Sequence, residues 1–103
     1  MKNAISPMAI PGLKTADEIA AEIWDIPEEL LKVKTRKREV VEARMVLISY
    51  RYRNLNETQE SASNQYGLKE HTSTIHACKT VDALLQTDKD FGHKHEEFCK
   101  RIK

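Results

Sequence analysis

Apolar residues recur every three or four positions along most of the chain after residue 15, and no segment shows the strict apolar–polar alternation of a half-buried strand. This spacing gathers apolar side chains on one face of a helix. The pattern therefore predicts an all-α domain of about six helices, over residues 16–24, 27–31, 39–55, 58–66, 71–85 and 87–102.

Local signals place the ends of these helices. Thr15 is followed three residues later by Glu18, which is the S/T-x-x-E capping box that begins a helix. Pro27 suits the first position of the short second helix, and Thr58 is a suitable cap for the fourth. Gly67 stands where a helix commonly ends in a left-handed residue. Residues 32–38 are basic and show no periodicity, so we expect a loop there.

Three of the helices have faces that the sequence defines. Helix 39–55 has a broad apolar face, which predicts that it is the central core element. Helix 71–85 is predicted to turn inward the side that carries Ile75, Cys78, Val81, Leu84 and Leu85. Its opposite, exposed side carries Thr72, Ser73, His76, Lys79 and Thr80. The last helix is expected to bury Phe91, His95, Phe98 and Ile102.

Length and composition narrow the class of protein. With 103 residues, the chain has room for one core, and we divide it into an irregular arm (residues 1–13) and a helical domain (residues 14–103). No apolar run approaches the roughly 20 residues of a membrane helix. Two cysteines, Cys78 and Cys99, are too few for a disulfide framework. These features predict a small cytoplasmic domain rather than a multidomain enzyme, a membrane protein or a secreted module.

Charge is unevenly distributed, although the formal net charge is only +1. Residues 1–31 carry two basic and six acidic side chains, whereas residues 32–53 carry eight basic and two acidic ones. Residues 54–103 are nearly balanced. A local basic block favours a polyanionic partner such as nucleic acid, although a solvated helix face has the same composition.

Residues 58–85 have the form of a helix-turn-helix: a short helix, a turn that contains Gly67, and a longer helix with an apolar inner side. The exposed start of that second helix carries small polar groups and histidines, which can reach base edges, and a helix N-terminus accepts a phosphate. The pattern favours DNA reading, with a packed helical hairpin as the alternative.

The motif at residues 66–79, Y-G-L-K-E-H-T-S-T-I-H-A-C-K, resembles the signature of the C-terminal DNA-binding domain (domain IV) of the bacterial replication initiator DnaA. That signature runs approximately F-G-G-R-D-H-T-T-V-L-H-A followed by a basic residue. The likeness continues upstream to Thr15 through the first helix pair, the basic loop and the long helix. It covers about 85 residues. The resemblance implies an all-α domain with a helix-turn-helix of the Trp-repressor type.

The resemblance also implies a partner and a site. In this family the domain binds short duplex DNA boxes at the replication origin, with the helix-turn-helix in the major groove and an arginine of the basic loop in the minor groove. The implied base-reading residues are Lys69, Glu70, His71 and Thr72. The implied phosphate contacts are Ser73, His76, Lys79 and Arg44. Arg36 best matches the minor-groove arginine, and the alternatives in the loop are Lys34, Lys37 and Arg38.

The chain departs from the family pattern where bases are read. The family's Arg-Asp pair is Lys69-Glu70, and its second glycine is Leu68. Lysine offers a point charge where arginine grips guanine with two hydrogen bonds, so the preferred DNA sequence is expected to differ. Glu60 adds a negative charge where the family has a proline, and Thr80 replaces a lysine. These changes leave open a second function: a regulator or protein-interaction module that keeps the fold and uses the acidic first helix, with Asp17, Glu18, Glu22 and Asp25.

Other chemistry has little support in the sequence. There is no G-x-x-x-x-G-K-[ST] loop, so we expect no nucleotide cofactor and a free-standing DNA-binding domain without the initiator's ATPase. His93, His95 and Cys99 lie close together, but they lack the four compact ligands of structural zinc, and we expect no metal. Cys78 and His76 face different sides of one helix, so we expect no nucleophilic pair and no enzyme activity. A nucleoid-associated location, with no membrane partner, follows from this interpretation, and the oligomeric state stays open.

Overall fold

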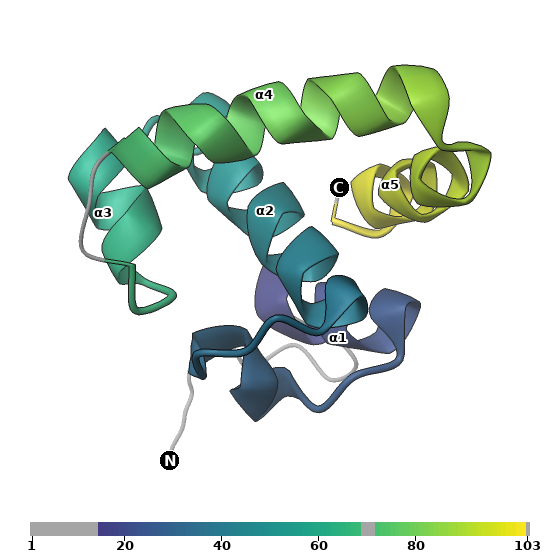
Figure 1. Cartoon of the computed structure of the whole chain (residues 1–103), viewed down its shortest axis with the longest axis horizontal. Helices are drawn as coiled ribbons and strands as arrows, with labels where there is room; N and C mark the ends of the chain where they lie inside the picture. Colours follow the sequence, from purple (N-terminus) through teal and green to yellow (C-terminus); the bar gives the residue numbers. More distant parts are fainter. Residues whose placement is uncertain (1–14, 69–71, 103) are drawn as a thin grey trace, which may run out of the picture.

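The computed structural model describes residues 15–68 and 72–102. In this part of the chain the structure consists of helices and connecting loops, without strands, which confirms the all-α prediction. Five α-helices and one 3-10 helix follow one another in these described ranges (Figure 1). Their bounds are α1 (Ala16–Trp24), η2 (Glu28–Lys32), α2 (Arg38–Arg53), α3 (Gln59–Asn64), α4 (Thr72–Thr87) and α5 (Lys89–Arg101).

The predicted helix starts are confirmed at two caps. The Thr15 hydroxyl accepts a hydrogen bond from the Glu18 N–H at 3.2 Å, and the Glu18 carboxylate accepts one from the Thr15 N–H at 3.1 Å, which completes the capping box. The Thr58 hydroxyl accepts from the Ser61 N–H at 3.0 Å at the start of α3. Pro27 is the cap before η2 rather than its first residue. The short η2 is a 3-10 helix, a form that proteins use in short segments.

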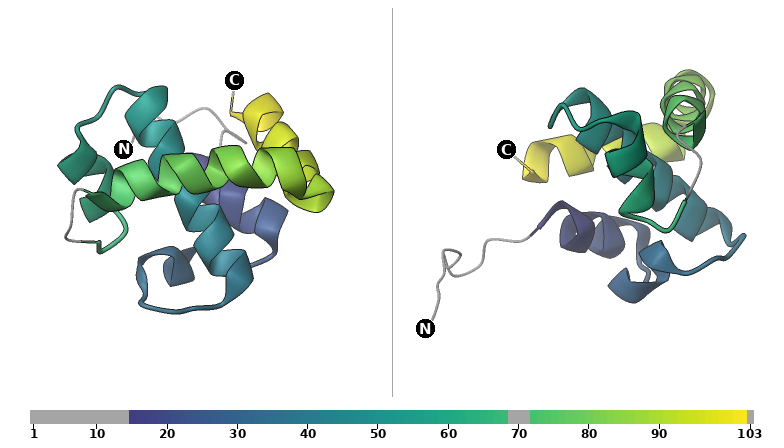
Figure 2. Two further views of the ribbon diagram at one scale, coloured as in Figure 1. Left: turned by 45° about the horizontal axis from the view of Figure 1, so that its top comes forward. Right: turned by 90° about the vertical axis from the view of Figure 1, so that its left-hand side faces the viewer.

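The central element is α2, as predicted from its broad apolar face. It packs against α1, η2, α3 and α4, while α5 closes the remaining side against α1 and α4 (Figure 2). Aromatic pairs join the layers: the Trp24 and Phe91 ring centroids lie 6.1 Å apart, and Tyr50 meets Phe98 edge-to-face at 5.6 Å. These contacts fix α5 against α1 and α2.

The inner face of α4 differs from the predicted one. The buried side chains of α4 are Thr74, Ala77, Cys78 and Val81, whereas Ile75 and Leu84 are half-buried and Leu85 is 41% exposed. The helix is therefore turned toward Thr74. Burial of the polar Thr74 side chain is possible because its hydroxyl is hydrogen-bonded to groups on α3.

A hydrogen-bonded cluster ties the first helix to the helix-turn-helix. The Tyr66 hydroxyl donates to Asp17 at 2.7 Å and accepts from Arg51 Nε at 2.9 Å, and Arg51 also binds Glu57 at 2.9 Å. Burial raises the pKa of Tyr66, so its hydroxyl keeps its proton and remains a donor. The cluster joins α1, α2 and the end of α3.

None of the helices in residues 15–68 and 72–102 is long and apolar enough to span a membrane.

Candidate nucleic-acid interface

The angle between α3 and α4 is set by a small buried polar cluster. The Thr74 hydroxyl lies 2.7 Å from the Gln59 carbonyl oxygen and 2.5 Å from the Ser63 hydroxyl, which is 3.0 Å from the same carbonyl. Since each hydroxyl has one proton, one of them donates to the other, which donates to the carbonyl. Thr74 and Ser63 are completely buried. Because each hydroxyl is paired, the cluster holds the two helices in one orientation.

The turn between α3 and α4 lies against the start of the basic loop. Gly67 has φ +79°, a left-handed conformation that confirms the role expected for this glycine, although α3 itself ends three residues earlier, at Asn64. A Cβ atom at Gly67 would lie 3.5 Å from the Lys32 carbonyl oxygen, which is ordinary van der Waals contact. The backbone conformation, rather than lack of space, therefore requires glycine here. The short distance also shows that the turn lies beside Lys32, the residue that precedes the basic loop.

The predicted base-reading residues fall at the edge of what the structure describes. Lys69, Glu70 and His71 lie outside the described residues, and Thr72 is described only as the first residue of α4. Their contact with bases stays a prediction. The described part of the outer face continues with Ser73, which is half-buried, and with His76 and Lys79, which are exposed. The His76 Nε2 lies 3.5 Å from the Thr80 hydroxyl one turn later.

The basic loop consists of residues 33–37, between η2 and α2. In the right-hand view of Figure 2 the loop (blue) and α4 (light green) lie on the same side of the domain. Lys34, Arg36 and Lys37 are exposed, and within residues 15–68 and 72–102 none of the three has a side-chain hydrogen bond or ion pair. The Thr35 hydroxyl accepts from the Lys37 N–H at 3.3 Å and so shapes the loop. Three cations are thus available to an external anion.

Arg38, the fourth cation of the predicted minor-groove set, is already paired. Its Nε lies 2.7 Å from Glu42, and its terminal nitrogen lies 2.6 Å from Asp88, which caps α5. The hydrogen bond to Glu42 is the largest cause that raises the pKa of Arg38. Glu42 also accepts from the Trp24 indole N–H at 3.1 Å. Arg38 therefore links the end of the loop to the core and is less suited than its three neighbours to enter a minor groove.

Arg44 is nearly buried, with an exposed fraction of 9%, and it holds the other end of the loop. Its Nε donates to the Leu31 carbonyl oxygen at 3.0 Å, and a terminal nitrogen donates to the Val33 carbonyl oxygen at 2.7 Å. Burial lowers the pKa of Arg44. Arg44 also lines, with Ser73 and His76, a hollow of about 160 Å³ between α2 and the first turns of α4. The structure thus gathers three of the four predicted phosphate residues around one depression.

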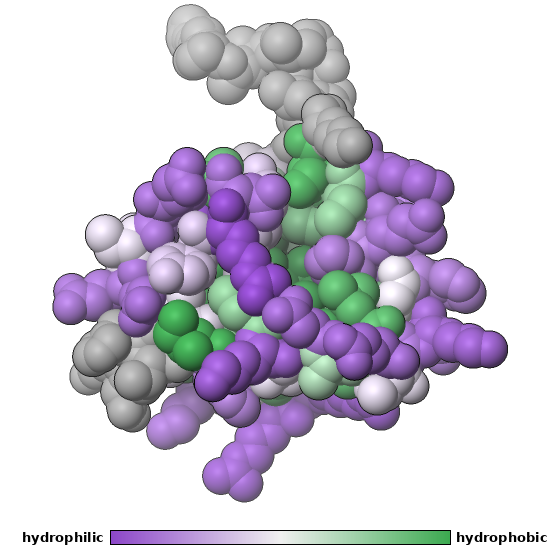
Figure 3. Space-filling model, turned by 90° about the horizontal axis from the view of Figure 1, so that it is seen from above, coloured by the Kyte–Doolittle hydropathy of each residue, from purple (hydrophilic) through white to green (hydrophobic). Residues whose placement is uncertain are grey.

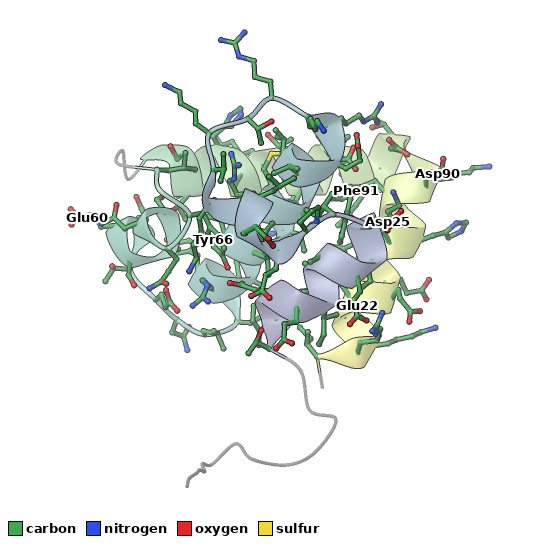
Figure 4. The ribbon with its side chains drawn as sticks, turned by 90° about the horizontal axis from the view of Figure 1, so that it is seen from below. Glu22, Asp25, Glu60, Tyr66, Asp90 and Phe91 are labelled. Atoms are coloured by element: carbon green, nitrogen blue, oxygen red, sulfur yellow. The ribbon has the colours of Figure 1, made fainter. Side chains whose placement is uncertain are left out.

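Some of the acidic side chains lie on α1 and α5, away from α3. Figure 4 shows Glu22 and Asp25 on the α1 segment and Asp90 on α5, away from Glu60 on α3. Within α1, Asp17 binds Tyr66, Glu18 caps its own helix, and Glu22 accepts from Arg101 at 2.6 Å. Three of the four acidic residues that we considered for protein recruitment are therefore engaged inside the domain.

Sequence reasoning missed the residues that position this site. Gln59, Ser63 and Thr74 set the helix-turn-helix angle, and Asp88 holds Arg38 across 50 positions of sequence. No local pattern signals such contacts.

In residues 15–68 and 72–102, no group of three or more His, Cys, Asp or Glu side chains is arranged to hold a metal ion.

Comparison with known proteins supports the resemblance seen at residues 66–79. No protein-family model and no solved structure matches the chain. The chain is 33% identical over 85 residues, 82% of its length, to "Chromosomal replication initiator protein DnaA" of Flavobacterium psychrophilum. The protein of the same name from Bacteroides thetaiotaomicron is 32% identical over 84% of the chain, and that from Symbiobacterium thermophilum is 28% identical over 88%.

This chain is a DnaA-like domain. It spans about a fifth of the length of these relatives (18%, 18% and 20%). The match covers the first helix pair, the basic loop, the central helix and the helix-turn-helix together, which are the parts that the structure packs around α2. The likeness is therefore to a folded domain and not to an isolated motif.

Proposed function

We propose that this DnaA-like domain binds double-stranded DNA in a sequence-selective way, in the recognition of a replication origin or its regulation. The start of α4 enters the major groove, and the basic loop reaches the adjacent minor groove. The observation that carries this proposal is that α4 and the basic loop, which contains three available cations (Lys34, Arg36 and Lys37), lie on one side of the domain. The matched relatives are named replication initiators, which supports the choice of DNA.

Two devices support the joint use of both grooves. The Gly67 turn lies beside the backbone of Lys32, and Arg44 bonds the carbonyl groups of Leu31 and Val33. The start of the loop is thus anchored to α2 and lies beside the helix-turn-helix, while Arg38 anchors the end of the loop. A major groove about 12 Å wide admits one α-helix, and the neighbouring minor groove favours an inserted arginine where it is narrow. Anchoring the loop at both ends lowers the entropy cost of that insertion.

The test is selection of bound duplexes from a random pool, followed by gel-shift titration of the selected duplex at several salt concentrations. We expect one sequence to be enriched, and with roughly 4–6 phosphate contacts we expect a log–log salt slope of about −4 to −5. A pool without enrichment would contradict sequence selectivity. Absence of salt-dependent binding would contradict DNA binding altogether.

The matched variants are Arg36→Ala and Lys100→Ala. Each removes one exposed positive charge, but Lys100 lies on α5, where it pairs only loosely with Glu96 at 3.9 Å. We expect Arg36→Ala to weaken binding to all duplexes and to flatten the salt slope by about one unit. Lys100→Ala should leave both quantities unchanged. Equal effects of the two variants would show that net charge, and not the loop, attracts the DNA.

A further inference from the structure

A groove lined by both apolar and polar side chains lies on another face of the domain, between the second half of α2, the end of α4 and α5. Its volume is about 470 Å³, within the range of ligand clefts. Phe98 and Val81 form its buried floor, and Leu55, Leu85 and Ile102 lie along its edges. Figure 3 shows the apolar strip between hydrophilic flanks. None of the residues that line it belongs to the DNA-binding face described above.

The groove holds an unusual share of the exposed apolar surface. Among the described residues three large hydrophobic side chains are exposed, and two of them, Leu55 (48%) and Leu85 (41%), line this groove. Single exposed apolar residues are common, but a cluster around a concave strip is typical of a surface that is covered.

Side-chain contacts join α1 to the last turns of both α2 and α5. Asp17 accepts from Tyr66 and lies 3.8 Å from Arg51, near the end of α2. Glu22 accepts from Arg101 at 2.6 Å, at the end of α5. Figure 4 likewise shows the α1 segment, with Glu22, running alongside α5. Leu55 and Ile102 follow the ends of α2 and α5, so α1 is joined to the two helices whose ends border the groove.

We propose that residues 1–14 of this chain occupy the groove, with their aliphatic side chains against Leu55, Leu85 and Ile102. The segment contains Ile5, Met8, Ile10 and Leu13 and no acidic residue. Fourteen residues span up to about 46–50 Å when extended, and the longest dimension of the whole molecule is 44 Å, so the tether reaches every part of the groove.

Covalent attachment favours this occupant over a second copy of the chain. A short tether presents the segment at an effective concentration in the millimolar range, independent of dilution. A stable dimer buries about 800 Å² on each partner, whereas the exposed apolar side chains here form one narrow strip. A narrow strip can be covered by an extended segment whose aliphatic side chains are spaced along it.

The experiment uses the full chain with labelled Ile, Leu and Met methyl groups, observed by NMR. We expect cross-peaks between methyl groups of Ile10 or Leu13 and those of Leu55 or Leu85. The double variant Ile10→Asp/Leu13→Asp should lose these cross-peaks and shift the Leu55 and Leu85 signals. The control Asn3→Asp/Ser6→Asp adds the same charge to the same segment at polar positions, and it should leave them in place.

Two further samples complete the test. Leu85→Asp should release the segment, whereas Gln86→Asp, at an exposed position of the same helix that does not line the groove, should not. Cross-peaks between chains in a mixture of differently labelled samples, lost on dilution, would overturn the proposal in favour of a second copy. Groove signals that are identical in all the variants of residues 1–14 would overturn it as well. Because the groove and the DNA-binding face share no residue, gel-shift affinity should be unchanged throughout.

Discussion

Replacing Arg44 by methionine tests whether this arginine anchors the basic loop. Methionine keeps a long apolar stem but removes both donors, which now bond the carbonyl oxygens of Leu31 at 3.0 Å and Val33 at 2.7 Å. A hydrogen bond to a charged group contributes about 1.5–3 kcal/mol. Leu31 is fully buried, so its carbonyl loses its partner, whereas Val33 is half exposed and its carbonyl regains water. We expect a loss of about 2–3 kcal/mol in the free energy of unfolding.

Urea unfolding followed by tryptophan fluorescence measures this loss, because the single tryptophan, Trp24, is buried in the core. With a slope of about 1.2 kcal/mol/M, the midpoint should fall by about 2 M, and Tm should fall by roughly 10–20 °C. Since a domain of this size has a stability of about 5–15 kcal/mol, the variant should still fold. Arg44→Lys can reach one carbonyl at a time, so its urea midpoint should lie between those of the wild type and Arg44→Met.

The matched control is Arg36→Met, which removes an exposed arginine without a partner among the described residues. Its unfolding free energy should change by less than about 0.5 kcal/mol, while its affinity for DNA should fall. The two variants should therefore separate stability from binding. If Arg44→Met unfolds at the same urea concentration as the wild type, the carbonyl bonds do not hold the loop, and the anchoring role of Arg44 is refuted.

Four further variants address α4, the residue that precedes it, and α5. Thr74→Val keeps the shape of a fully buried side chain but leaves the Gln59 carbonyl and the Ser63 hydroxyl with one hydrogen-bond partner fewer. Urea unfolding should therefore show a loss of about 1–3 kcal/mol in the free energy of unfolding. An unchanged urea midpoint would contradict the role of this cluster. His71→Ala and Thr72→Ala should each weaken binding to the selected duplex by about 1–3 kcal/mol, whereas binding to random DNA should change very little. If gel shifts show an unchanged ratio of affinity for the selected duplex to affinity for random DNA, the docking of α4 in the major groove is refuted. Burial lowers the pKa of His95, so the folded state binds its proton less readily than the unfolded state. Its contribution to stability is complete above the unfolded pKa of about 6.5 and is lost as the pH falls through the lower folded value. The difference in urea midpoint between pH 8 and pH 5 should therefore shrink in His95→Gln, and an equal difference in both proteins would argue against this histidine.

Features that depend on near neighbours in sequence were accessible without the structure. The capping box at Thr15 and Glu18 joins residues three apart, and the left-handed Gly67 follows from the need to turn between two helices. Helical periodicity likewise identified α2 as the core element, because burial of one face follows directly from spacing. These interactions are local, so the residues themselves determine them.

Contacts between distant segments were decided by the tertiary structure alone. The pattern of α4 placed Thr74 neither inside nor outside, and its burial depends on Gln59 and Ser63, which a separate helix brings within hydrogen-bond distance. The charge pattern of the basic block does not show which of its cations are paired. In the structure Arg38 binds Asp88, 50 residues away, and Arg44 donates to the Leu31 carbonyl oxygen in η2. A charge in sequence has no fixed partner. Only packing determines which cations are paired within the domain and which ones face outward to meet an anion.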